Sequence, residues 1–155
     1  MINKSTQDDI NKCIEEYSSK IDAARPSKHS LSNYKIEKPW GYEIWLDLNQ
    51  FYAYKIIHMN KGFKSSLQSH EYKVEANFII EGTAEVLLED DNGELQSHFF
   101  KKGDGWIVPV NKKHRVIATT DYTALEVSSP NLNDVIRYND EFGRGNGKIN
   151  SEHSK

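Results

Sequence analysis

The stretch that decides the fold is GFKSSLQSHEYKVEANFIIEG, residues 62–82. Within it, Gln68 and His70 are two residues apart, so on a strand both side chains lie on one face of the sheet. Glu75 is five residues beyond His70, which is the wrong parity for an unbroken strand. A turn through residues 71–73 would reset the alternation and return Glu75 to the same face. The stretch therefore predicts two short strands that present these polar side chains to one interior.

A second stretch, GDGWIVPVNKKHR at residues 103–115, combines an apolar run with a histidine. The apolar run at residues 106–110 predicts a strand, and His114 follows it after a tight turn. Asn111 lies in that turn, and asparagine tolerates a left-handed backbone better than most residues.

Short strands surround these two stretches. The runs are rich in β-branched or aromatic residues, and turn residues such as Asn92 and Gly93 separate them. The runs are YEIWLDL (42–48), FYAYKIIHM (51–59), VEANFIIE (74–81), TAEVLLE (83–89), ELQSHFF (94–100), WIVPV (106–110), HRVIAT (114–119) and YTALEV (122–127). About eight strands at a spacing of roughly 8–12 residues are typical of a sandwich or barrel of the jelly-roll kind. We therefore expect an all-β fold.

The N-terminal segment has a different pattern. Residues 5–24 predict a helix, because apolar residues recur there at steps of three and four. That apolar stripe consists of Ile10, Cys13, Ile14, Tyr17 and Ile21. We expect the helix and a polar linker at residues 1–37, one barrel domain at 38–144 and a flexible polar tail at 145–155.

Composition narrows the class of partner. The chain has 155 residues, a formal net charge of −3 and a charged fraction of 28%. It offers no basic surface that would favour nucleic acid or an anionic membrane, and no apolar run long enough to span a bilayer. The N-terminus lacks the apolar core of a secretory signal, and we expect a cytoplasmic protein. Cys13 is the single cysteine, so the chain cannot form an internal disulfide, which agrees with that compartment.

The two stretches together resemble a cupin. The residues that fit the cupin pattern are Gly62, His70, Glu75, Gly82, Gly103, Pro109 and His114, with Gln68 where the first histidine is usual. The Gln-x-His pair followed by Lys73 and Glu75 resembles, more narrowly, the cupin domain of the mannose-6-phosphate isomerases. KPWGYE at 38–43, Lys55, LEV at 125–127 and DVIRYNDEFGR at 134–144 are similar to segments of the same family, so the resemblance covers roughly residues 38–144.

That resemblance implies one divalent metal ion, held by Gln68, His70, Glu75 and His114. Two imidazoles, one carboxylate and one amide oxygen suit Zn, Mn, Co or Ni with positions left open for substrate. The alternative is that four polar side chains point into a barrel without an ion, and each would then cost about 1–3 kcal/mol. The remaining histidines lack such neighbours in the sequence, and we expect them at the surface or in local hydrogen bonds; they are His29, His58, His98 and His153.

The resemblance also implies an aldose–ketose isomerase acting on a sugar or a sugar phosphate. On this view Lys55, Lys73, Arg137 and Arg144 bind substrate, and the catalytic candidates are Glu126, Lys73 and Arg137. The metal would polarise the carbonyl, and a base such as Glu126 would move a proton between neighbouring carbons through an enediolate.

Two other functions stay open, and we expect a homodimer. One is a non-catalytic, sugar-binding cupin in carbohydrate or surface-polysaccharide metabolism. The other is a metal-dependent oxygenase or lyase acting on a small organic acid, against which Gln68 argues because most such sites use histidine there. The homodimer is expected to form through strand edges, which readily pair with a second copy.

Overall fold

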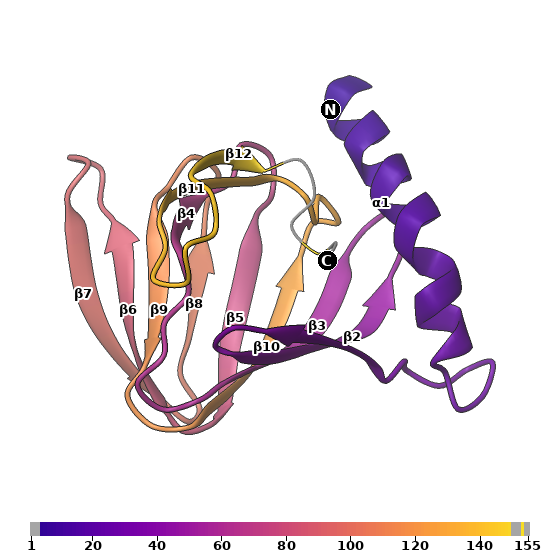
Figure 1. The fold of residues 1–155 in the computed structure, drawn as a ribbon, viewed down its shortest axis with the longest axis horizontal. Coiled ribbons are helices and arrows are strands. Elements are labelled where there is room, and N and C mark those ends of the chain that lie inside the picture. The colour runs from indigo at the N-terminus through magenta and orange to yellow at the C-terminus, as the bar shows by residue number, and fades with distance from the viewer. Residues whose placement is uncertain (1–3, 150–152, 154–155) are drawn as a thin grey trace.

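Alternation of buried and outward side chains builds the strands of this protein. In the segment AYKIIHM, the side chains at 53, 55, 57 and 59 are buried, and the three residues between them are partly exposed. A computed structural model describes residues 4–149 and 153 and shows two facing β-sheets with a helix at one end (Figure 1). The elements are α1 (Lys4–Ala23), β1 (Tyr34–Lys38), β2 (Gly41–Leu48), β3 (Ala53–Met59), β4 (Leu67–Ser69), β5 (Glu75–Glu81), β6 (Thr83–Glu89), β7 (Leu95–Lys101), β8 (Gly105–Val108), β9 (His114–Ala118), β10 (Tyr122–Ser128), β11 (Val135–Asn139) and β12 (Gly147–Ile149).

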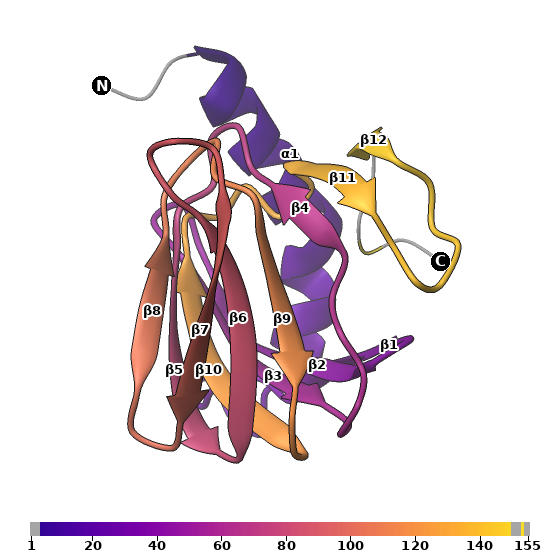
Figure 2. The ribbon, with the colours of Figure 1, turned by 90° about the vertical axis from the view of Figure 1, so that its left-hand side faces the viewer.

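Each sheet has six strands, and the pairs are antiparallel. The order is β1-β2-β3-β10-β5-β8 in sheet A and β12-β11-β4-β9-β6-β7 in sheet B. From β3 to β11 the chain crosses between the sheets at almost every connection, the β6–β7 hairpin excepted. This is a jelly roll, and the all-β expectation with an appended helix is confirmed. Figure 2 shows β11 lying crosswise to the long strands β6 and β9.

Two apolar clusters hold the elements together. One fills the space between the sheets and includes Ile79, Val86 and Trp106. The other joins α1 to sheet A, where Tyr17 meets the Trp45 ring edge-on at a centroid distance of 4.8 Å. The apolar stripe of the helix therefore packs on the barrel.

No helix in the described residues is long and apolar enough to cross a membrane.

The boundaries differ from the sequence prediction at both ends of the barrel. The expected linker at residues 25–37 already contains most of β1, which pairs with β2. The expected tail contains β12, which pairs with β11, and it contains the buried His153. Single-sequence patterns missed both because short edge strands of three to five residues carry little periodic signal.

Candidate metal centre and pocket

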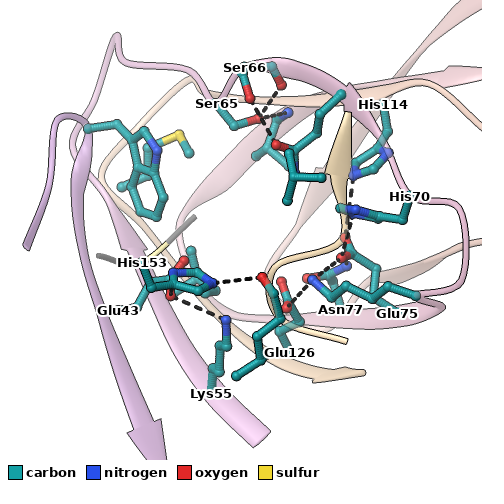
Figure 3. Close-up of a pocket in the computed structure, with 18 of the residues that line it drawn as sticks. Glu43, Lys55, Ser65, Ser66, His70, Glu75, Asn77, His114, Glu126 and His153 are labelled. Carbon is teal, nitrogen blue, oxygen red and sulfur yellow. Dashed lines mark hydrogen bonds and ion pairs between the residues drawn. The ribbon is translucent and has the colours of Figure 1, made fainter. Parts of the chain in front are cut away.

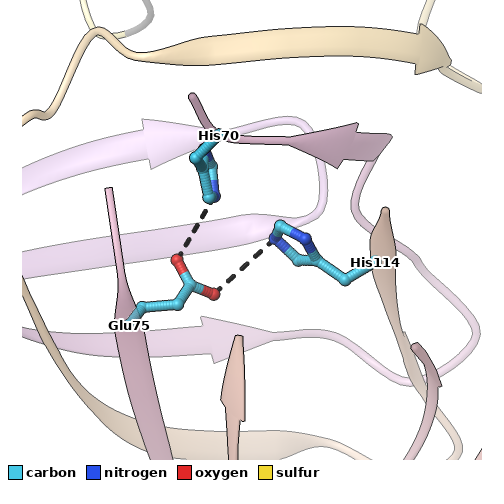
Figure 4. A group of neighbouring side chains, drawn as sticks. All are labelled: His70, Glu75 and His114. Atoms are coloured by element: carbon cyan, nitrogen blue, oxygen red, sulfur yellow. Dashed lines mark ion pairs between the residues drawn. The ribbon is translucent and has the colours of Figure 1, made fainter. Parts of the chain in front are cut away.

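Two histidines and a glutamate from three strands or their ends meet inside the barrel. His70 follows β4, Glu75 begins β5 and His114 begins β9. The His70 Nε2 lies 3.4 Å from Glu75 Oε2, and the His114 Nε2 lies 3.7 Å from Glu75 Oε1 (Figure 4). One ligand atom from each residue lies within 4.8 Å of the others. This spacing can hold one metal ion.

The hydrogen bonds of the two imidazoles orient them toward that point. The His70 Nδ1–H donates to the Asp134 carbonyl at 2.6 Å, and the His114 Nδ1–H donates to the Lys112 carbonyl at 3.1 Å. Each Nε2 is fully buried and has no hydrogen-bond partner among the described residues. Metal-binding histidines are commonly arranged in this way. A backbone carbonyl holds one ring nitrogen, and the other nitrogen directs its lone pair at the metal ion. The residues present therefore fit a divalent metal ion.

Gln68 lies beside this group. Its position in β4 is paired across the ladder with His114, and its side chain lines the same cavity. The side-chain Oε1 accepts a hydrogen bond from Ser66 Oγ at 2.8 Å. That bond fixes the amide with its oxygen as an acceptor, which is the atom that a metal would use.

Asp134 holds the turn that the sequence analysis predicts between His70 and Glu75. Its carboxylate accepts hydrogen bonds from the backbone N–H groups of Glu71, Tyr72 and Lys73 at 3.0, 2.6 and 2.8 Å. These bonds close the turn, and Glu75 returns to the face that carries His70. Sequence reasoning missed this role, although an aspartate is a typical acceptor for the N–H groups of a tight turn.

The candidate ligands line a cavity of about 90 Å³ inside the barrel (Figure 3). Its walls also include the substrate and catalytic candidates Lys55, Lys73, Glu126 and Arg144. Residues that the sequence analysis did not single out as site residues complete the lining, and they include Glu43, Asn77, Tyr122 and His153.

A buried ion pair lies next to the metal-facing group. The Lys73 Nζ is 2.9 Å from Glu75 Oε2 and 3.2 Å from Glu126 Oε1. Burial alone would lower the pKa of Lys73, but the two carboxylates raise it, so the amine stays charged. Burial, together with the charge of Glu75, raises the pKa of Glu126 above its ordinary value, although Lys73 opposes that shift. Glu126 points inward, as strand alternation predicts.

A second charged group closes the far end of the cavity. The Lys55 Nζ lies 3.3 Å from Glu43 Oε2 and 4.6 Å above the Trp45 ring. Burial would raise the pKa of Glu43, but the charges of Lys55 and of Lys38 lower it, so the carboxylate stays ionised. The Trp45 Nε1–H donates to the same carboxylate oxygen at 2.8 Å.

His153 belongs to this second group. Of the two expectations for it, a surface position or hydrogen bonding, the structure shows a buried ring held by hydrogen bonds. Its Nδ1 accepts a hydrogen bond from the Lys38 Nζ at 3.0 Å, and its Nε2–H donates to the Leu132 carbonyl at 3.1 Å. Burial and the charge of Lys55 hold its pKa well below the ordinary value. Nothing in the residues around position 153 signals this, because the contact depends on a chain reversal after β11.

The two arginine candidates have different surroundings. Arg137 is buried in β11, its Nη1 donates to the Gly145 carbonyl at 3.2 Å, and it is not among the residues that line the cavity. Arg144 does line the cavity, and its Nη2 lies 2.8 Å from Asp140 Oδ1. The structure thus brings Arg144 to the pocket but gives Arg137 a backbone contact outside it.

With this site in view, comparison with known proteins assigns the family. The family described as "Mannose-6-phosphate isomerase C-terminal" matches residues 25–140. The chain belongs to that family. It is 27% identical over 136 residues to the xanthan biosynthesis protein XanB of Xanthomonas campestris pv. campestris, covering 84% of this chain and 28% of that protein. It is 26% identical over 148 residues to a mannose-1-phosphate guanylyltransferase of Salmonella montevideo, covering 92% and 29%. The chain therefore spans less than a third of these relatives.

Solved structures resemble the barrel at lower identity. A tryptophan-to-phenylalanine variant of oxalate decarboxylase from B. subtilis gives a TM-score of 0.63 at 20% identity, covering 78% of this chain and 34% of that one. CapF from Staphylococcus aureus gives 0.59 at 15% identity, covering 68% and 34%, and KdgF from Halomonas sp. gives 0.55 at 17%, covering 62% and 86%. At these identities the likeness shows the fold alone, and the cupin prediction is confirmed.

Proposed function

We propose that the protein is a metal-dependent isomerase that interconverts the aldose and ketose forms of a sugar or sugar phosphate. The observation that carries the proposal is the pair of orphaned Nε2 atoms facing Glu75, with the charged Lys73–Glu126 pair in the same cavity. The relatives named for xanthan biosynthesis and for mannose-1-phosphate guanylyl transfer support a sugar as the substrate class.

The metal-binding residues would be Gln68, His70, Glu75 and His114. A divalent ion bound there would supply Lewis acidity toward a carbonyl oxygen. These four side chains hold and orient it, and the buried walls exclude most bulk water from the reacting carbons.

Glu126 is our candidate for the group that moves the proton. Its carboxylate lies in the cavity with a raised pKa, and a carboxylate with a raised pKa exchanges protons more readily near neutral pH. It would take a proton from the carbon beside the carbonyl and return it to the neighbouring carbon. Lys73, 3.2 Å away, would position this carboxylate and stabilise the negative charge of the enediolate.

Deuterium wash-in tests this proposal. The Zn-, Mn- or Co-loaded protein is incubated in D₂O with a panel of aldoses, ketoses and their phosphates, and mass spectrometry locates the label. We expect label at C1 or C2 with the wild type and none with the Gln68→Ala, His70→Ala double variant. Glu126→Gln should keep the metal and lose the label. Full metal occupancy without label or isomerised product would reject the isomerase and leave a sugar-binding protein.

We also propose that the protein is a homodimer, formed through the outer face of sheet A. The strongest support is a groove of about 540 Å³ on that face, lined by apolar side chains that include Phe51, Val127 and Ile107. This surface replaces the strand edge that the sequence analysis favours as the contact.

A further inference from the structure

The loop at residues 129–134, which joins β10 to β11, contacts both the candidate metal centre and helix α1. Its residues alternate in what they hydrogen-bond. Leu132 and Asp134 bond to His153 and His70 of the site, and Asn131 and Asn133 bond to α1. The four loop residues are 1% to 6% exposed. A buried loop with partners of both kinds can transmit the position of the helix to the site.

At the metal centre, this loop holds the ring of His70 and the turn that follows it. The Asp134 carbonyl accepts a hydrogen bond from the His70 Nδ1–H at 2.6 Å. The Asp134 carboxylate accepts bonds from three backbone N–H groups of the turn at residues 71–73. The acceptor on one nitrogen of a metal-binding histidine fixes the orientation of its ring. A shift of the loop would therefore move the His70 Nε2 atom away from the point that the other ligands face.

Helix α1 fixes the other residues of the loop. The Asn131 Nδ2–H donates to Asp9 Oδ2 at 3.2 Å, and the Asn133 Nδ2–H donates to Cys13 Sγ at 3.7 Å. Asp9 and Cys13 are four residues apart, so both lie on the helix face that meets the loop. A carboxylate is a strong acceptor and a sulfur a weak one. The bond to Asp9 is therefore the stronger of the two.

Backbone hydrogen bonds within the loop join these two sets of contacts. The Asp134 N–H donates to the Asn131 carbonyl at 3.2 Å, and the Val135 N–H donates to the Asn133 carbonyl at 3.0 Å. Each bond ties a residue held by α1 to one at or beside Asp134. A displacement at Asn131 is therefore passed on to the carbonyl and the carboxylate that hold the metal centre.

The helix lies outside the part of the chain that the family pattern describes. That pattern covers residues 25–140, and α1 ends at Ala23. A helix that only covered sheet A would need its apolar stripe and no more. Asp9 adds a polar contact to a residue that is 1% exposed, Asn131, in the loop that supports the ligands.

We propose that Asp9 and Asn131 are positioning residues of the metal centre, through which α1 raises the affinity of the site for its ion. Neither residue touches the ion. Their hydrogen bond holds the loop, and the loop holds the His70 ring and the turn that returns Glu75 to the same face. This inference rests on the metal centre of the proposed function and not on the isomerase reaction.

Zinc titration tests the proposal. Asp9→Ala and Asn131→Ala should each lower the Zn²⁺ affinity at least about fivefold, a smaller loss than removal of a residue bonded directly to a ligand. Asp9→Asn keeps an acceptor oxygen for the Asn131 amide and should recover most of the affinity. Asp8→Ala removes an exposed carboxylate one residue away and should bind as the wild type. Wild-type affinity in the folded Asp9→Ala and Asn131→Ala proteins would overturn the proposal.

Cobalt absorption separates positioning from a general loss of stability. The visible bands of bound Co²⁺ depend on the geometry of its ligands. At saturating metal, we expect changed bands in Asp9→Ala and wild-type bands in Ile21→Val, which trims a buried side chain in the last turns of α1. Thermal unfolding of the metal-free proteins measures the stability that each variant loses. Bands that change in both variants, or in neither, would overturn the proposal.

A double variant tests the route through the loop. If Asp9 acts by holding Asp134, adding Asp9→Ala to Asp134→Ala should lower the Zn²⁺ affinity little further, because the supported contacts are already lost. Fully additive losses would overturn this route. Absence of metal binding by the wild type would overturn both this inference and the metal-dependent function. Metal binding without isomerisation would remove only the function.

Discussion

At the scale of single residues, hydrogen bonds fix the orientation of the two metal-facing imidazole rings, those of His70 and His114. Backbone carbonyls hold their Nδ1 atoms, and their Nε2 atoms are buried without a partner in the described part of the chain. A buried polar atom without a hydrogen bond lowers the stability of the fold by about 1–3 kcal/mol. An ion bound to the two Nε2 atoms would remove this penalty.

Removing one imidazole should therefore affect metal binding much more than folding. We expect His70→Ala to lower the affinity for Zn²⁺ at least about 100-fold, because one of the few ligands is lost and the ring that remains cannot replace it. Calorimetric titration with Zn²⁺ and metal analysis after dialysis measure the change. His98→Ala, on the exposed strand β7, is the control and should bind as the wild type. Unchanged affinity in His70→Ala would place the metal elsewhere.

The same burial makes the metal-free protein sensitive to acid. Burial lowers the pKa of His114 from 6.5 to about 4, although the charge of Glu75 opposes the shift. Between these two values the unfolded chain holds a proton that the folded chain lacks, so lowering the pH favours unfolding. We expect the free energy of unfolding to fall by about 1.5 kcal/mol from this residue between pH 6.5 and pH 5.

Urea unfolding of the metal-free protein at the two pH values measures this loss. His114→Gln removes the titrating ring and should show a smaller loss over the same interval. His153, whose pKa is also lowered by burial, should account for part of what remains. An equal loss in the wild type and in His114→Gln would contradict the assignment.

At the scale of elements, the turn between β4 and β5 decides whether the ligands meet. Strand alternation alone would place Glu75 on the opposite face from His70, and the turn at residues 71–73 corrects this. Asp134, in the connection between β10 and β11, holds that turn through three backbone N–H groups. The metal site thus depends on a contact between two segments about sixty residues apart.

Replacing Asp134 should loosen the site without touching a ligand side chain. We expect Asp134→Ala to lower the Zn²⁺ affinity about 10- to 100-fold, as is usual when an outer partner of a metal ligand is removed. Asp134→Asn keeps an acceptor oxygen and should recover part of the affinity. Zinc titration measures both, and thermal unfolding separates weaker binding from global instability. Wild-type affinity in a folded Asp134→Ala protein would show that the turn stands without this carboxylate.

At the scale of the whole molecule, the outer face of sheet A is unusually apolar. In the groove, Phe51 is 85% exposed and Ile107 is 70% exposed, with Val127 and Val74 beside them. With Phe78 nearby, these side chains expose on the order of 600 Å² per copy, which approaches the roughly 800 Å² that each partner gives to a standard interface. A protruding ring next to a groove is self-complementary under a two-fold axis, which favours a second copy as the occupant.

Sedimentation equilibrium at micromolar concentration measures this association. We expect a dimer for the wild type, and Ile107→Asp should weaken it at least about tenfold because a charge would be buried in an apolar contact. Phe99→Ser is the matched control: Phe99 is 74% exposed but lies on β7, away from the groove. A wild-type monomer at these concentrations would reject the interface.

The sequence by itself determined the features that depend on local pattern. Alternating strands, the helical stripe ending at Ile21 and the left-handed turn at Asn111, where φ is 60°, can be predicted because the cause lies within a few residues. Strand parity and one turn also predicted that Gln68, His70 and Glu75 share a face, and the family resemblance added His114 to them.

Only the tertiary structure decided what surrounds those ligands. The partners of Lys55 and Lys73, the exclusion of Arg137 from the cavity and the burial of His153 each depend on contacts between distant segments. A sequence records the charge of a lysine but not which carboxylate will neutralise it. That pairing follows from how two sheets and a C-terminal segment pack, and it sets the charge of the pocket.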